Sequence, residues 1–421
     1  MRYSRDRRAQ VSTPRRFAIF SLVFTALAAC DLIRLDWGHG PIPQQILILR
    51  YAVVLTAIAA LLSFKRSART SGIQVTHLSW IGFGALASLS GFAHADLTSI
   101  GTGLWMMTAV PLLFGWVLPR VLGTQGIKIV VVAIIGAGLP YILCSFAMYP
   151  IRAPYAGVTA NPNSMGVIAA GTTTALIAVL VATLKSERPW LRLIVTVSAV
   201  ASGALVIASS SRTSFFAVVC AALVAAGACW PILFRRPGRM LALAFACLLG
   251  LTAVLFFGGG QSPEVSHFVA KFENPHATVL SNRDDIWSTV WSQTTVLGHG
   301  SQYFQTEVGS AAHNSFVEML GTYGILGAFG LIAVALSSLY ATFQYYLRNR
   351  SREPYALSPL LIAVCFWTLA SGEGMVAPLG GAVNLAFFLM AGLTTLLPAP
   401  VPAMPMYALS RVPEEALASA V

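Results

Sequence analysis

Charged side chains are scarce in this chain, making up 10% of its 421 residues. A soluble domain carries about 25% charged residues. The hydrophobic fraction is 56% and the mean hydropathy is +0.73. A shortage of charge on this scale excludes an ordinary water-soluble globular protein, because most of the surface must face lipid.

The charge that is present carries one sign in excess, with a net value of +12. An excess of Lys and Arg can indicate nucleic-acid binding. Here, however, the basic residues form short clusters between apolar runs, which is the loop pattern of membrane proteins. We therefore expect the lipid bilayer as a partner and no nucleic acid.

Long apolar runs are the dominant feature of the sequence. A run of about 20 residues can cross a bilayer as a helix. The sequence therefore predicts an all-α, polytopic membrane protein with about twelve transmembrane helices. Since internal repeats and low-complexity linkers are lacking, we expect one membrane domain over residues 1–421, and a secondary transporter of repeated halves is disfavoured. The runs are 17–34, 46–64, 74–93, 98–118, 126–149, 164–184, 190–209, 213–234, 239–257, 315–346, 356–371 and 378–397.

The distribution of Lys and Arg predicts the orientation. With the N-terminus inside, 21 of the 27 basic residues fall in inside segments and six fall outside. Loops rich in Lys and Arg stay in the cytoplasm. We therefore expect a bacterial inner-membrane protein with both termini cytoplasmic and a large periplasmic loop at residues 258–313.

Cysteine is lacking in the predicted outer loops, since all six cysteines lie within apolar runs. Disulfides form in oxidising compartments, so none is expected here. Cys30 follows Leu27-Ala28-Ala29 after a basic start, which resembles a lipoprotein cleavage signal. Small residues and cysteine also occur in membrane helices, so we favour a retained first helix and leave cleavage at Cys30 open.

The large outer loop has a helical pattern of its own. Asp284 and Asp285 follow the N-cap candidates Ser281 and Asn282, and apolar residues then recur at helical spacing. This predicts a short amphipathic helix against the membrane, with Trp287 and Trp291 at the headgroup level. Gly298-His299-Gly300 predicts a turn.

The end of the loop carries the next helix signal. Ser315-Phe316-Val317-Glu318 matches the Ser-x-x-Glu capping box, so a helix is expected to start at Ser315 with His313 just outside it. Glycines recur at every third position from Gly321 to Gly330, which predicts the close approach of a neighbouring helix.

An enzyme on the outer face has no ATP or nucleotide sugar, so its substrate must arrive already activated, usually on a lipid. Paired arginines are suited to a lipid diphosphate because their planar forks bind phosphate oxygens bidentately. Arg212, in a tight turn between helices, and Arg283 are the candidates. The alternatives are a snorkelling Arg212 and an Arg283 that pairs with Asp284 or Asp285, although adjacent helical residues do not face each other.

His313 is the candidate base, because a neutral histidine can take a proton from a hydroxyl nucleophile. The alternative is a capping or interfacial histidine. Asp31 and Glu373, each at a helix end, could steer a catalytic group or simply be hydrated. A metal cluster among Glu264, His267, Glu273 and His276 matches no ligand spacing, so no metal is expected.

Several motifs together resemble the O-antigen ligase superfamily, which includes related O-antigen and exopolysaccharide polymerases. They are Ser281–Trp287, Gly298-His299-Gly300, Ala312-His313-Asn314-Ser315 with Gly321–Gly327, Asn161–Gly166 and Ser211-Arg212-Thr213. The resemblance implies a glycosyltransferase that uses an undecaprenyl-diphosphate-linked glycan and needs neither metal nor cofactor. It also implies that Arg212 and Arg283 hold the diphosphate and that His313 activates the acceptor, with Glu373 and Asn314 as supporting residues.

The resulting hypothesis is an inverting transfer to an acceptor glycan. The acceptor is either a lipid A core, in a ligase, or another lipid-linked repeat, in a polymerase. The rival from another class is a lipid-linked glycan flippase or other membrane transporter, which would show basic residues along a central path. A structural membrane protein is the third alternative.

Overall fold

The fold is known from a computed structural model that describes residues 13–38, 40–66, 68–152, 154–159, 161–184, 189–234 and 283–397. The predicted helix at 239–257 and the first part of the large loop, 258–282, lie outside these ranges. Within them every regular element is a helix, and two isolated β-bridges pair Leu35 with Thr159 and Thr70 with Leu396.

Each predicted apolar run in the described ranges lies on one or more of these helices. The elements are α1 (Thr13–Asp31), η2 (Leu32–Arg34), α2 (Gln44–Leu62), α3 (Val75–Ala93), α4 (Leu97–Thr108), the π-helix η3 (Ala109–Val117), α5 (Leu118–Leu122), η4 (Gly123–Gln125), α6 (Gly126–Met148), α7 (Pro162–Thr183), α8 (Pro189–Ala208), α9 (Arg212–Phe234), α12 (Asp284–Ser292), α13 (Tyr303–Thr306), α14 (Ser315–Asn349), α15 (Ser358–Ala370) and α16 (Ala382–Leu393).

Seven helices in the described ranges are long and apolar enough to cross a membrane, and α15 and α16 are shorter apolar helices. One of the seven is the 52-residue stretch Leu97–Met148. It combines two predicted crossings, which are separated at Gly123, where φ is +65°. The all-α, multi-pass prediction is therefore supported, whereas the total of twelve helices stays a prediction.

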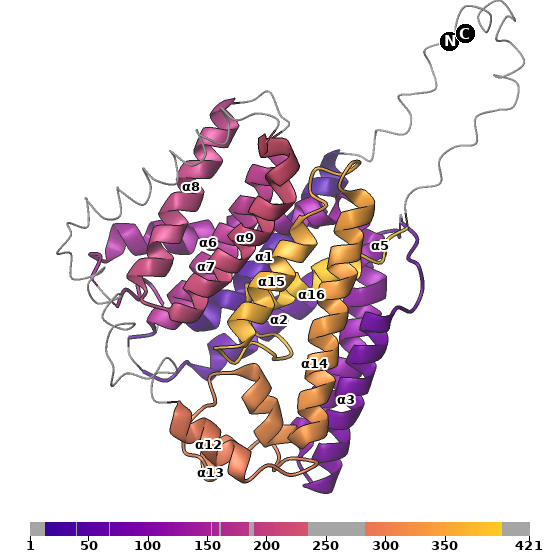
Figure 1. The fold of residues 1–421 in the computed structure, drawn as a ribbon, viewed down its shortest axis with the longest axis vertical. Helices are drawn as coiled ribbons and strands as arrows, with labels where there is room; N and C mark the ends of the chain where they lie inside the picture. The colour runs from indigo at the N-terminus through magenta and orange to yellow at the C-terminus, as the bar shows by residue number, and fades with distance from the viewer. Residues whose placement is uncertain are drawn as a thin grey trace, which may run out of the picture.

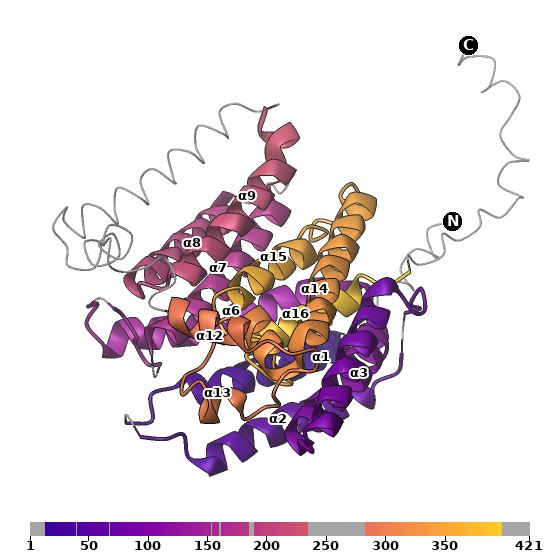
Figure 2. The ribbon, with the colours of Figure 1, turned by 60° about the horizontal axis from the view of Figure 1, so that its bottom comes forward.

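The centre of the bundle is formed by α7, which has 78% of its apolar window buried, the largest share of the seven. It packs against α6, α8, α9 and α15, and α15 in turn packs against α9, α14 and α16. On the other side of α14 lies α3, which runs antiparallel to it along the edge of the bundle (Figure 1). The elements α12 and α13 lie at the end of the bundle where α14 begins (Figures 1 and 2).

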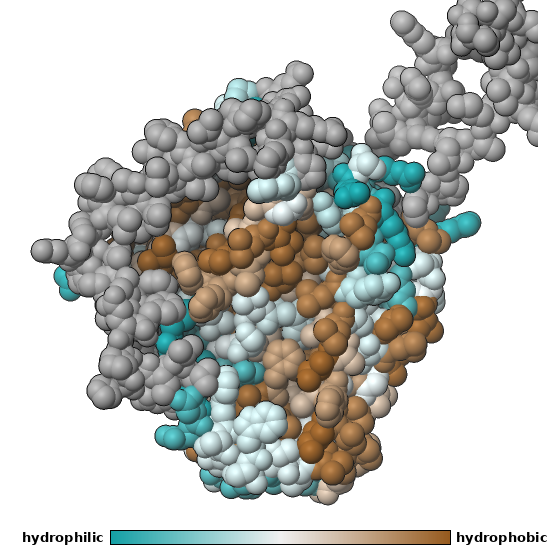
Figure 3. Space-filling view, viewed as in Figure 1, coloured by the Kyte–Doolittle hydropathy of each residue, from teal (hydrophilic) through white to brown (hydrophobic). Residues whose placement is uncertain are grey.

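The outer surface is apolar across the middle of the bundle. Figure 3 shows hydrophobic side chains over α14, α15 and α3, and hydrophilic ones at the lower edge beside α12 and α13. On α14, Phe329 and Leu336 are each 65% exposed. Apolar side chains turned outward at this density fit a surface that faces lipid acyl chains.

The glycines of α14 have three different roles. Gly330 allows the predicted close approach, since a Cβ there would lie 3.3 Å from Phe83 of α3. Gly321 faces Phe304 of α13 instead. Gly324 interrupts the helix, with φ +74° and ψ −167°.

The interruption at Gly324 frees backbone groups that bind the outer loop. The N–H of Ile325 donates to Thr295, and the N–H groups of His299 and Gly300 donate to the carbonyls of Gly321 and Thr322. Gly298 also has a positive φ of +75°, and the backbone of residue 322 leaves no room there for a side chain. The predicted Gly-His-Gly turn is therefore a docking joint between the loop and α14.

The two tryptophans of α12 face different environments. The Trp287 indole donates to the carbonyl of Ala312 at 3.1 Å and packs on the cluster of Val290, Tyr303 and Phe304. Trp291 is 63% exposed. Trp287 therefore fills the space between the loop helices, whereas the placement of the two tryptophans at the headgroup level stays a prediction.

Candidate active site

Four segments that are distant in sequence meet at the end of the bundle occupied by α12 and α13. They are the starts of α9, α12 and α14 and the turn 371–376 that follows α15. Their polar contacts run through Arg283, Glu373 and the residues before α14.

Arg283 links three of these segments. Its Nη1 donates to the carbonyl of His313 at 3.0 Å and to that of Gly372 at 2.7 Å. Its Nη2 lies 3.9 Å from Oε1 of Glu373. Burial lowers the pKa of Arg283 and the Glu373 carboxylate opposes that shift. The alternative in which Asp284 or Asp285 pairs with Arg283 is therefore wrong, because the carboxylate partner of Arg283 is Glu373.

His313 lies beside the same carboxylate, with its Nδ1 3.7 Å from Oε2 of Glu373. Glu373 therefore faces both the cation and the candidate base. The backbone of His313 has φ +49°, in the left-handed region that non-glycine residues rarely adopt. Such conformations persist where surrounding contacts enforce them, and here the carbonyl is held by Arg283. The side chain remains 43% exposed, so a substrate can reach it.

Asn314 is the N-cap of α14. Its Oδ1 accepts from the N–H of Phe316 at 2.8 Å and of Val317 at 3.2 Å, and its Nδ2 donates to the carbonyl of Ser371 at 2.9 Å. α14 begins at Ser315 as predicted, but the predicted capping box is wrong. The Ser315 hydroxyl instead donates to the carbonyl of Glu373 at 3.0 Å, because the turn 371–376 offers it a partner.

Arg212 opens α9 after a tight serine turn in which Ser210 has φ +54°. The positive charge of Arg283 acts on Arg212 across this end of the bundle. Next to Arg212, Thr213 lies against Gly372, where an added Cβ would be 2.2 Å from its hydroxyl oxygen. Arg283 and the neighbour of Arg212 therefore both contact the turn at Gly372.

The motif Asn161–Gly166, at the start of α7, packs against the serine turn that precedes Arg212. Asn161 caps α7 by accepting from the N–H of Ser164 at 2.8 Å. Gly166 lets α7 approach closely, since a Cβ there would lie 2.7 Å from Ser211 and 2.8 Å from the Ser214 hydroxyl. A motif without catalytic side chains thus positions Arg212.

Asp31, a predicted candidate, and His299, part of the predicted turn, have structural contacts. Asp31 is buried, lies 3.7 Å from Arg34 and accepts from the N–H of Ala382 at the start of α16, so it is neither hydrated nor in the site. His299 stacks on Tyr303 with ring centroids 4.5 Å apart, and its Nε2 lies 2.7 Å from the carbonyl of Gln293. The metal alternative of residues 264–276 lies outside the described residues.

Glu318 is a site residue that the sequence reasoning missed. Its place in Ser315-Phe316-Val317-Glu318 predicts the second member of a capping box, yet its carboxylate lies against the turn at Gly374, where it feels the charge of His313. The available signal was its place in the first turn of the helix that follows His313. In the described part of the chain, no three metal-ligating side chains come together.

The site therefore places two arginines, a partly exposed histidine and a bridging carboxylate at one end of an apolar helical bundle. Chemically, such an arrangement can bind an anion through its guanidinium groups and can accept a proton on its histidine. Residues 197–332 match the O-antigen ligase family. The match confirms the resemblance to the O-antigen ligase superfamily and supports an enzyme of the ligase and polymerase type in a multi-pass bacterial membrane protein.

The matched range contains Arg212, Arg283, His313 and Asn314 but ends before Glu373. The place of Glu373 in the site therefore rests on the structure. No curated protein matches the chain significantly.

Proposed function

We propose that this protein is an inner-membrane glycosyltransferase that moves a glycan from undecaprenyl diphosphate to a sugar hydroxyl on the periplasmic face. The observation that supports it is the contact between Glu373 and both Arg283 and His313, beside Arg212. The family match supports the same class of substrates.

In the proposed reaction, the acceptor oxygen attacks the anomeric carbon from the face opposite the diphosphate, which inverts that centre. The new C–O bond forms as the bond to the diphosphate oxygen breaks, and undecaprenyl diphosphate leaves. Arg212 and Arg283 stabilise the negative charge that develops on the leaving group. No metal is required, since guanidinium groups supply the positive charge.

His313 receives the acceptor proton in this scheme. Since its Nδ1 faces Glu373, its Nε2 is the nitrogen available to the acceptor hydroxyl. Glu373 then stabilises the imidazolium, and Arg283 fixes the backbone of His313 through its carbonyl. Alignment of two membrane-held substrates contributes several kcal/mol to the acceleration.

A deletion strain tests the function and separates its two forms. Loss of a polymerase leaves single repeats on the carrier lipid, whereas loss of a ligase leaves long lipid-linked chains and a bare core. Unchanged lipid-linked and surface glycans in the mass spectra would contradict both. The two forms share the donor head, so the site residues do not discriminate between them.

The rival flippase needs a separate experiment, because its loss would also alter surface glycans. A flippase moves its substrate between the two leaflets of a bilayer, whereas glycan transfer does not require a bilayer. Purified protein in detergent should therefore convert a lipid-linked donor and an acceptor into a longer glycan. Absence of product in detergent, together with donor movement across proteoliposomes, would favour the flippase.

A further inference from the structure

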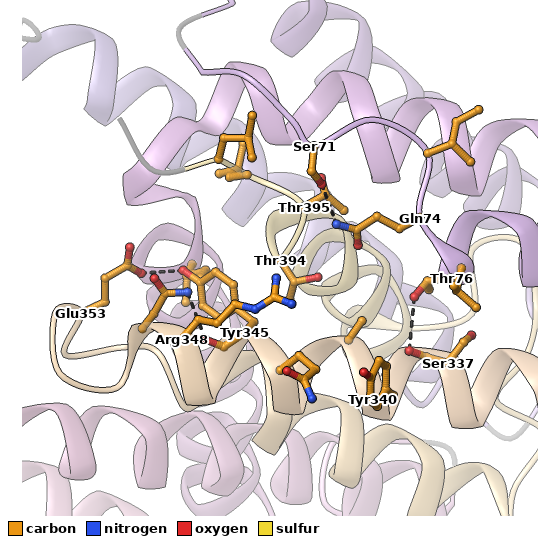
Figure 4. A pocket seen from close by; sticks show the side chains of 18 of the residues that line it. Ser71, Gln74, Thr76, Ser337, Tyr340, Tyr345, Arg348, Glu353, Thr394 and Thr395 are labelled. Carbon is orange, nitrogen blue, oxygen red and sulfur yellow. Dashed lines mark hydrogen bonds between the residues drawn. The ribbon is translucent and has the colours of Figure 1, made fainter. Parts of the chain in front are cut away.

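A pocket lies at the end of α14 opposite His313. It has a volume of about 630 Å³ and lies between the start of α3, the last turns of α14 and residues 394–397 after α16 (Figure 4). The volume is within the range of about 300–1,000 Å³ typical of small-molecule sites. Because α14 has 35 residues, the pocket is remote from the transfer site.

The polar side of the pocket is basic. Arg348 and Arg352 line it, and the Arg348 side chain extends into it toward Thr394 (Figure 4). The nearest acid, Glu353, accepts a hydrogen bond from the Tyr345 hydroxyl. In the described ranges the ion pairs involve neither arginine. The pocket therefore presents positive charge that an anion can neutralise.

The other side of the pocket is apolar and opens toward the surface. Ile73, Val75 and Leu78 line it from α3 and its approach, and are 76%, 66% and 57% exposed. Tyr340 of α14 faces them and is 64% exposed. A site with charge at one end and an apolar flank that continues into the outer surface matches an amphiphile rather than a free metabolite.

We propose that this pocket binds an anionic phospholipid from the leaflet at this end of the bundle. The phosphate lies between Arg348 and Arg352, since guanidinium forks match phosphate oxygens. One acyl chain lies along Ile73, Val75 and Leu78. A zwitterionic lipid binds less well, because the lining offers little compensating charge for a cationic headgroup once Glu353 is engaged by Tyr345. The bound lipid joins α3, α14 and α16 at their ends.

Native mass spectrometry of the full-length protein, with added phosphatidylglycerol or phosphatidylcholine, tests this site. Arg348→Gln and Arg352→Gln should each weaken phosphatidylglycerol binding by about tenfold, the effect of losing one charge-assisted hydrogen bond. Arg350→Gln is the matched control, since Arg350 is exposed at the same helix end but does not line the pocket. The control should bind as the unmodified protein does.

Three results would overturn the proposal. An equal loss in Arg350→Gln would show a general attraction to the basic helix end. Equal binding of phosphatidylcholine would show that charge is not recognised. Displacement of the lipid by glycerol 3-phosphate at the same concentration would show a site for soluble phosphate esters. Ala341→Trp, which fills the apolar side, should weaken binding while the protein stays monodisperse, and unchanged binding there would contradict the acyl-chain placement.

Discussion

At the scale of single residues, His313 is the group whose position most directly implies chemistry. His313→Ala should reduce glycan transfer by about 100- to 10,000-fold, because it removes the proton acceptor. Transfer by the purified variant at fixed donor and acceptor concentrations checks this. His94→Ala is the control, since His94 is also an exposed histidine and lies in the turn between α3 and α4, outside the four site segments. Near-normal transfer by His313→Ala would remove this residue from the mechanism.

The two arginines should tolerate no conservative exchange. Arg283→Lys and Arg212→Lys keep the charge but lose the bidentate fork, so each should slow transfer by about 10- to 100-fold. In Arg283→Lys the hydrogen bonds to His313 and Gly372 are also lost. Exposed Arg152 provides the control as Arg152→Lys. Chelation with EDTA should leave transfer unchanged. Loss of transfer in EDTA, followed by its recovery on addition of a divalent ion, would contradict the proposal that the arginines bind the diphosphate without a metal.

At the scale of elements, the interruption of α14 at Gly324 is the most constrained feature. A Cβ at this glycine would lie 2.4 Å from the carbonyl oxygen of Val296, and its φ is +74°. Gly324→Ala should therefore lower the free energy of unfolding by about 1–3 kcal/mol, as for other strained backbone positions. Denaturant titration in detergent, followed by tryptophan fluorescence, measures the change.

Gly101→Ala is the matched control for Gly324→Ala. Gly101 lies inside α4, and an added Cβ there has nothing within 4 Å. Alanine in a helix interior is about 1 kcal/mol more favourable than glycine, so this variant should be as stable as the parent or more so. If both variants behaved alike, the joint between α14 and the loop would not depend on Gly324.

A second contact fixes the loop to the bundle. The Asp96 carboxylate accepts from the N–H of Ser301 at 2.6 Å and caps α4 through Thr98 and Ser99. Although partial burial acts in the opposite direction, the hydrogen bonds from Ser99 and Ser301 hold the pKa of Asp96 below its ordinary range. The loop that carries His313 is thus joined to the α3–α4 turn through Ser301, as well as to α14.

At the scale of the whole molecule, the proposed orientation requires the transfer site and the lipid pocket to lie on opposite sides of the membrane. Reporter fusions near Gly260 or Ser301 should read as periplasmic, and fusions at Ser67, Pro237 and Ser351 as cytoplasmic, because Lys and Arg concentrate in the latter loops. Alkaline phosphatase and fluorescent-protein reporters measure this. A cytoplasmic signal from Ser301 would overturn the proposed orientation.

The sequence by itself determined the class of molecule and the residues of interest. Apolar runs of bilayer length predict helices wherever they occur, since a backbone in lipid must satisfy its own hydrogen bonds. The positions of His313, Arg212 and Arg283 could likewise be selected, because charged and titratable groups are few. These are local signals, and the helices of the described ranges agree with them.

Only the tertiary structure decided how these residues are connected. Glu373 lies 60 residues beyond His313. Its flanking residues, Gly372 and Gly374, carry no sequence signal that it faces both Arg283 and His313. Ser315 matches the first position of a capping box, yet its hydroxyl binds the backbone of the turn at 373–376. Asn314 caps the helix instead. The long-range backbone partner of Ser315 thus replaces the local N–H groups of the helix start. Sequence spacing specifies contacts within a helix turn, whereas the packing of α9, α12, α14 and the 371–376 turn specifies contacts between them.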